Sequence, residues 1–191
     1  MKSVFLLSLA FLLQGCISSK FVSSSLIDKQ LKLEGEIVYI YNTLDIRTEE
    51  FSQEMLVFLN QQIVSRFKEK NVSTNVFNFK ESKVGTTYMV AGSGTIPIDQ
   101  FTSQYKSQEV DNNVNFRLLV IPSQMTVSGP WRFFTISWIL VDVDTGLVVW
   151  KGVSKGEHLV QFTINEMAEK RASQIVDGLF AELEKAKLFY E

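Results

Sequence analysis

Asp142 and Asp144 are the residues whose type and spacing come closest to an acid–base or phosphoryl-transfer site. Asp144 opens an Asp-Thr-Gly tripeptide, and acid catalysis by such an aspartate needs a second carboxylate with which to share a proton. The tripeptide occurs once, so one chain supplies half of that site. The Asp-x-Asp spacing would suit phosphoryl transfer at the end of a first strand, whereas this pair lies late in the chain between two strand-like runs. We therefore expect both aspartates to form a hairpin turn.

Other ligand-binding patterns are incomplete in the sequence. The chain has one Cys and one His, which are too few for a Cys/His zinc site. The Gly-Ser-Gly run at residues 92–94 is not followed by the Lys-Ser/Thr of a phosphate loop, and His158 has no nucleophile within a recognisable motif. A net charge of −2 does not favour nucleic-acid binding. We expect no metal, no cofactor, no nucleic acid and no enzymatic activity.

The N-terminal residues are the most informative part of the sequence, because they end in its only Cys. Lys2 precedes an apolar run over residues 4–13, which has the length of a signal-peptide core and is too short to span a membrane. The ending Leu13-Gln14-Gly15-Cys16 resembles the lipobox of bacterial lipoproteins. The resemblance implies cleavage before Cys16 and acylation of its thiol and new amino group, which would anchor the protein stably in a membrane. The alternatives are a plain secretory signal and a short buried helix.

The same resemblance predicts the location and the boundaries of the protein. Ile17 stands where an Asp would mark retention in the inner membrane of enterobacteria, so we expect a lipid-anchored protein on the periplasmic face of the outer membrane. Residues 1–15 are then the signal peptide. Residues 16–34, with five Ser, form the lipidated Cys and a flexible tether. Residues 35–191 form the folded domain.

Composition and periodicity predict that this domain is a single α/β unit. A chain of 191 residues that is 46% hydrophobic can bury a sizeable core. Strands are predicted at residues 36–41, 72–79, 86–91 and 116–121, with a connection at 122–130 and a hairpin formed by 133–143 and 147–154. An amphipathic helix of about 21 residues is predicted from a cap at Thr48, with Lys68 and Lys70 at its end and Asn71 as its terminator. Further helices are predicted from Pro97 to residue 105 and over residues 163–188 behind a capping box at Thr163. We expect a mixed-sheet sandwich whose sheet is covered by two long helices.

Three tryptophans complete the set of candidate residues. Trp138 and Trp150 lie in the two strands of the hairpin, and we expect them in the core. Trp131 follows a turn at Pro130, so we expect it to be exposed and to contact a partner or lie near the lipid surface. The alternative is that Trp131 also belongs to the core.

The hairpin carries a second resemblance. Leu140, Asp142, Thr145, Gly146, Trp150 and Gly152 fit the pattern Leu-x-Asp-x-x-Thr-Gly-x-x-x-Trp-x-Gly. This pattern is similar to a hairpin in penicillin-binding-protein activator lipoproteins and in the curli-secretion lipoprotein. The resemblance implies a TolB-N-terminal-like α/β fold and an accessory role in the cell envelope.

Three functions compete on these observations. We expect a non-enzymatic binding module for an envelope complex, either a cell-wall synthase or a transport or secretion machine. The alternative is an oligomeric secretion or pore-associated lipoprotein, which predicts a homo-oligomer. An envelope hydrolase is the third, and it would use Asp142 and Asp144.

Overall fold

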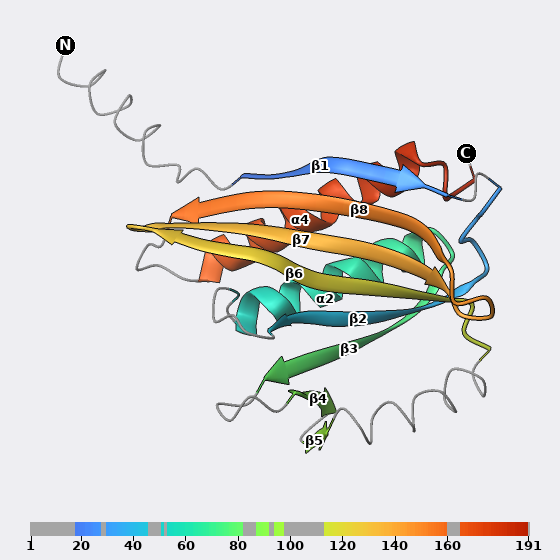
Figure 1. Cartoon of the computed structure of the whole chain (residues 1–191), viewed down its shortest axis with the longest axis horizontal. Coiled ribbons are helices and arrows are strands. Elements are labelled where there is room, and N and C mark those ends of the chain that lie inside the picture. The colour runs from blue at the N-terminus through green and yellow to red at the C-terminus, as the bar shows by residue number, and fades with distance from the viewer. Residues whose placement is uncertain are drawn as a thin grey trace, which may run out of the picture.

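The computed structural model describes residues 18–27, 30–45, 51, 53–81, 87–91, 94–97, 113–159 and 165–190. In this part of the chain, eight strands form one sheet and two helices pack against it (Figure 1). The elements are β1 (Ser18–Leu26), β2 (Ile37–Asp45), α2 (Gln53–Glu69), β3 (Ser73–Glu81), β4 (Thr87–Ala91), β5 (Gly94–Pro97), β6 (Phe116–Ser128), β7 (Trp131–Asp142), β8 (Val148–Leu159) and α4 (Asn165–Lys185).

Several predictions fall outside the described residues. They are the signal peptide at residues 1–15, the lipidation site Cys16, the helix caps at Thr48 and Thr163, and the helix predicted beyond Pro97. Pro97 itself is the last residue of β5.

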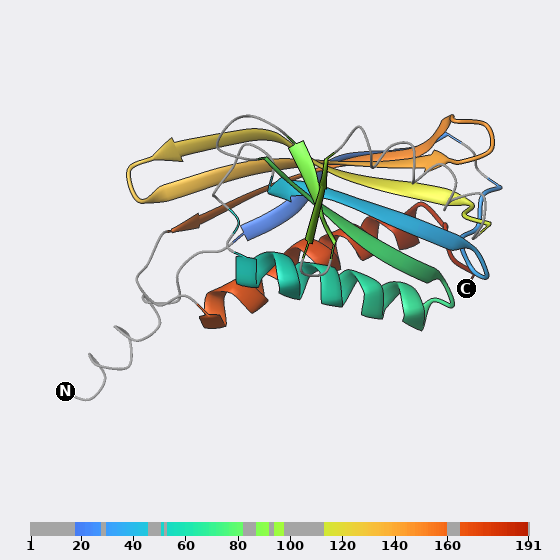
Figure 2. The same cartoon turned by 90° about the horizontal axis from the view of Figure 1, so that it is seen from below.

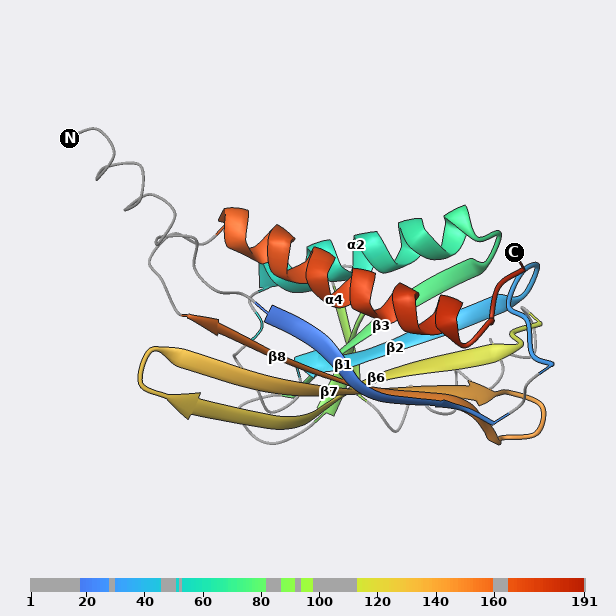
Figure 3. The same ribbon diagram turned by 90° about the horizontal axis from the view of Figure 1, so that it is seen from above.

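The sheet is mixed and has the strand order β1-β8-β7-β6-β2-β3-β4-β5. β2 runs parallel to β3 and β6, and the other pairs are antiparallel. α2 forms the crossover between the parallel strands β2 and β3, a connection that such a pair requires. Both helices lie on the same face of the sheet (Figures 2 and 3). The prediction of an α/β fold with one mixed sheet and two long helices is confirmed, and we call the opposite side the helix-free face.

The main core lies between the helices and the sheet. In α2 the buried residues recur at helical spacing from Met55 to Phe67, and α4 buries a matching stripe from Ala168 to Leu183. Every second residue of β7 is buried from Phe134 to Leu140, as a strand with one covered face requires. Within the described residues, no helix is both long and apolar enough to cross a membrane.

Trp138 and Trp150 are fully buried, so the prediction that they belong to the core is confirmed. The Trp138 indole Nε1 donates a hydrogen bond of 2.9 Å to Ser154 Oγ, which satisfies the buried N–H group. β8 makes room for these rings by placing small residues on its core side. A Cβ on Gly156 would lie 2.0 Å from the Phe134 ring, so a side chain there would displace the ring.

The prediction that residues 16–34 are a flexible tether is wrong for residues 18–26, which form β1. This strand pairs antiparallel with β8 from Ser18 opposite Glu157 to Leu26 opposite Trp150, with a register shift between Phe21 and Ser23. Phe21 holds the strand in place, because its ring lies 6.3 Å from the Trp138 ring and 6.4 Å from the Trp150 ring. The serines that predicted a tether instead suit an edge strand with polar exposed positions.

The prediction of a connection at residues 122–130 is also wrong. β6 continues through Pro122 to Ser128 and pairs with β7 until Trp131. The register shifts between Pro122 and Gln124, and such a bulge lets a proline remain in a strand because the local ladder is already interrupted. β6 and β7 therefore form a long hairpin whose turn lies at Gly129 and Pro130.

Three asparagines join α2 to the sheet. Asn42 on β2 donates a hydrogen bond of 2.9 Å to Asn60 on α2, and Asn60 donates one of 2.8 Å to Asn78 on β3. Asn42 and Asn78 are opposite each other in the parallel ladder. Asn42 Oδ1 also accepts a hydrogen bond from the Leu44 backbone. This relay fixes the helix to one position along the two strands.

Candidate functional site

The Asp-Thr-Gly motif forms the turn between β7 and β8. Asp142 Oδ1 accepts hydrogen bonds from the Thr145 backbone N–H and from Thr145 Oγ1, both at 2.7 Å. Gly146 has a φ of 69°, a conformation that costs little without a side chain. Asp144 is exposed at the turn. The prediction that both aspartates form a hairpin turn is confirmed, and the carboxylate of Asp142 stabilises that turn.

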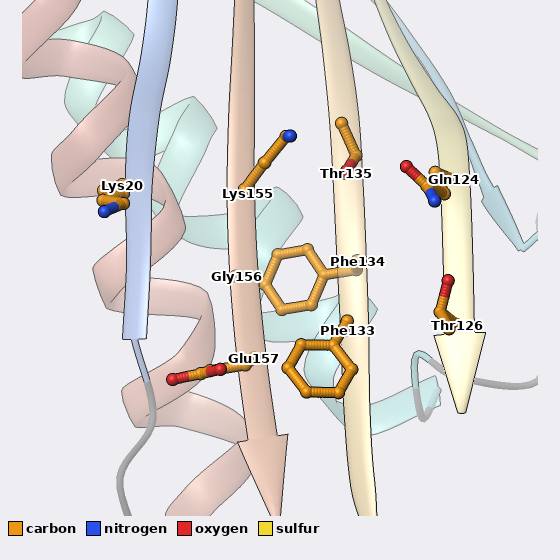
Figure 4. Close-up of a pocket in the computed structure, with 9 residues that line it drawn as sticks. All are labelled: Lys20, Gln124, Thr126, Phe133, Phe134, Thr135, Lys155, Gly156 and Glu157. Atoms are coloured by element: carbon orange, nitrogen blue, oxygen red, sulfur yellow. The ribbon is translucent and has the colours of Figure 1, made fainter. Parts of the chain in front are cut away.

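The helix-free face of β1, β8, β7 and β6 is the broadest exposed surface that these strands present. Strand alternation and cross-strand register place Lys20, Lys155, Thr135 and Gln124 in one row across the four strands. Figure 4 shows these four side chains side by side, and we call them the lysine row. The next row toward the end of the sheet contains Ser18, Glu157, Phe133 and Thr126.

A shallow pocket of about 340 Å³ lies over these two rows. Lys20 and Lys155 border it on one side, and Gln124 and Thr126 border it on the other (Figure 4). Phe133 contributes an apolar wall and is 37% exposed. The site therefore combines the positive charges of Lys20 and Lys155, the negative charge of Glu157, several neutral polar groups and the exposed Phe133 ring.

The electrostatics of the lysine row favour a negatively charged or strongly polar binding partner. Lys20 and Lys155 are exposed and directly opposite each other on neighbouring strands, a placement in which like charges repel. An anion between them would relieve the repulsion. Among the described residues, no group of three or more His, Cys, Asp or Glu side chains is placed to hold a metal ion. The arrangement suits recognition of a surface.

Trp131 lies at the end of the β6–β7 hairpin, where it pairs with Ser128 and with Leu159 of β8. Its side chain is half-buried, whereas Trp138 and Trp150 are buried completely. Trp131 and Phe133 are two positions apart on β7, so both lie on the helix-free face. The structure thus brings the predicted contact residue Trp131 to the same end of the face as the pocket.

The other half of the helix-free face differs in character. Farther along the strands, a second pocket is lined by Ser23, Ser25, Ser137 and Lys151 together with neighbouring apolar groups. Beyond β6, the same side of the sheet carries an aromatic cluster that includes Tyr39, Tyr41, Phe77 and Phe79.

Sequence reasoning missed the lysine row for a specific reason. The predicted strand ended at residue 154, one position before Lys155, whereas β8 continues to Leu159 and places Lys151 and Lys155 on one face. Lys20 was hidden because its segment was interpreted as a tether.

Comparisons with known proteins return distant structural similarities and no sequence relative. No protein-family model matches the chain, and no curated protein matches it. The chain is similar to the PelC dodecamer from Paraburkholderia phytofirmans, with 10% identity and a TM-score of 0.47 over 86% of this chain and 97% of that chain. It is similar to the lipoprotein GNA1162 from Neisseria meningitidis, with 12% identity and a TM-score of 0.43 over 76% and 99% of the two chains.

The comparison also returns a putative lipoprotein from Caulobacter crescentus, with 11% identity and a TM-score of 0.35 over 74% of this chain and 87% of that chain. Two of these three structures are named as lipoproteins. At these scores the similarities carry no argument about function. The specific likeness to the penicillin-binding-protein activator and curli-secretion group stays a prediction.

Proposed function

We propose that this protein is a lipid-anchored accessory module of the bacterial envelope, attached through Cys16 at the periplasmic face of the outer membrane. In this proposal it binds a protein partner and catalyses no reaction. The observation that carries the proposal is the helix-free face, on which four long strands expose lysine, serine, threonine and glutamine side chains. A flat, polar surface of this kind suits docking, since a protein interface is about as polar as the rest of the surface.

The position of β1 limits the distance between the proposed anchor and the folded domain. Cys16 precedes Ser18 by two residues, which span about 7 Å of extended chain. A tether of residues 17–34 would have reached roughly 60 Å, so the folded strand removes most of that reach. The domain would then be held close to the membrane, and its partner would have to meet it there. A cell-wall synthase or a transport or secretion complex with a domain near the membrane would satisfy this condition.

A second function is favoured by the free edge of β1. Among the described strands, β1 pairs only with β8. Val22 is 48% exposed, and Ser23 to Ser25 are exposed as well. An open strand edge can pair with another chain. This observation supports an oligomeric envelope component built from copies of the chain.

Site-specific photocrosslinking in living cells tests both functions. A photoreactive residue at Lys151 samples the helix-free face, and a matched one at Ala181 samples the exposed side of α4. We expect a partner protein to crosslink from position 151 and not from position 181. Equal crosslinking from both positions, or from neither, would contradict docking on this face. Crosslinks between copies from Val22 would favour the oligomeric component.

A further inference from the structure

Three features meet at the end of the sheet where β1 begins. The chain enters there from the predicted anchor, the β6–β7 hairpin turns there, and β8 ends there (Figure 1). We propose that this end of the helix-free face is a membrane-binding surface, with Trp131 and Phe133 in the lipid interface and Lys20 and Lys155 on phospholipid phosphates. The inference rests on the proposed anchoring through Cys16.

The strand register gives the order in which residues follow one another from the point where the chain enters the sheet. Ser18, the first residue of β1, is opposite Glu157, and Glu157 is opposite Phe133. Trp131 lies two residues farther along β7 in the direction from which the chain enters. Since Cys16 precedes Ser18 by only about 7 Å of extended chain, an acylated Cys16 would hold both aromatic residues beside the bilayer.

The side chains are suited to that position. Tryptophan is enriched at membrane–water interfaces because its ring is apolar and its N–H group is polar. Phe133 lies on the helix-free face and is 37% exposed, so its apolar ring is available to the lipid interface. The lysine row follows one row farther from the entry point, at a depth where long side chains reach the headgroups.

The charges favour the helix-free face as the side that meets the lipids. Lys20 and Lys155 contribute two positive charges to the pocket and Glu157 contributes one negative charge. At the same end of the molecule, the first turn of α2 exposes Glu54, and α4 exposes Glu169 with Lys170 beside it. Anionic phospholipids attract lysines near the surface, with a factor of about five in affinity for each. On the helix side at this end, Lys170 lies beside Glu169, and Arg171 is 8% exposed.

The tryptophans make the surface directly measurable. The mature lipidated chain is reconstituted into vesicles of phosphatidylcholine and phosphatidylglycerol, with brominated phosphatidylcholine as a contact quencher. Trp138 and Trp150 are fully buried, so we expect the quenched part of the emission to come from Trp131 and to fall at least five-fold in Trp131→Phe. The double variant Lys20→Gln, Lys155→Gln should lose the part of the quenching that depends on phosphatidylglycerol.

Lys151→Gln is the matched control, because Lys151 lies on the same strand and face as Lys155 but about 13 Å farther from the entry point. Its quenching should equal that of the wild type. Flotation of the vesicles separates the two proposals. Protein that floats without quenching overturns the membrane-binding surface alone and leaves Trp131 for a protein partner. Protein that does not float overturns the anchor on which both proposals rest. Unchanged quenching in the double lysine variant overturns the role of the lysines.

Discussion

Phe21→Ala should destabilise the whole domain, although the sequence places Phe21 in a serine-rich segment next to the proposed anchor at Cys16. The ring contacts both core indoles and lies beside Gly152 and Gly178, where the absence of side chains makes room for it. Replacing a fully buried phenylalanine by alanine costs about 3–5 kcal/mol. Because Phe21 is only partly buried, we expect the free energy of unfolding to fall by about 2 kcal/mol, which is about half of the cost for a fully buried ring.

Urea unfolding of the mature chain in detergent, followed by tryptophan fluorescence, measures this loss. With a slope of about 2 kcal/mol per molar urea, the midpoint should fall by about 1 M. Val22→Ala is the matched control in the same strand, because Val22 is 48% exposed and its truncation should change stability by about 0.5 kcal/mol or less. If the two variants unfolded at the same midpoint, β1 would not be docked on the sheet, and the prediction of a flexible tether would be restored.

Three further outcomes follow from the contacts of the core and from the anchor. Gly156→Ala should cost about 1–3 kcal/mol, since the new methyl group meets the buried Phe134 ring; unchanged thermal unfolding would contradict that packing. Ser154→Ala removes the acceptor of the Trp138 indole N–H and should cost about 1–3 kcal/mol, whereas Ser154→Thr retains a hydroxyl and provides the comparison. Cys16→Ala should abolish incorporation of labelled palmitate and release the protein from the membrane fraction, and continued labelling would refute the anchor.

The sequence predicted the elements whose periodicity is strong. The helical spacing from Met55 to Phe67 predicts an amphipathic helix, and the alternation around Trp138 predicts a strand with one covered face. In each case the apolar residues must lie on the buried side. The Asp142 turn was predictable for a similar reason, since Asp, Thr and Gly each contribute a local hydrogen bond or a special backbone conformation.

The remaining features depend on partners that are distant in the sequence. The residues next to Phe21 in the sequence do not show that its ring packs against two indoles and two glycines from β7, β8 and α4. Pro122 reads as a strand breaker until the bulge opposite β7 is known. The Asn42–Asn60 hydrogen bond joins residues 18 positions apart, and asparagine alone predicts a turn or a cap as readily as a buried relay. The lysine row also depends on a distant contact, because Lys20 lies beside Lys155 only when β1 pairs with β8.

The pairing of β1 with β8 also sets an order of events in the maturation of the protein. Ser18 and Glu157 are opposite each other although they are 139 positions apart, and contacts between such distant segments form late because a large loop must close first. The first strand of the chain therefore has no partner until nearly all of the chain is available. If Cys16 is the anchor proposed above, it would stay accessible during that interval to the enzymes that acylate it and cleave the chain before it. Pairing of β1 with β8 would then shorten the link between the proposed anchor and the folded domain. Under that proposal, a chain truncated before β8 would still be lipidated at Cys16, and its domain would have no fixed orientation at the membrane.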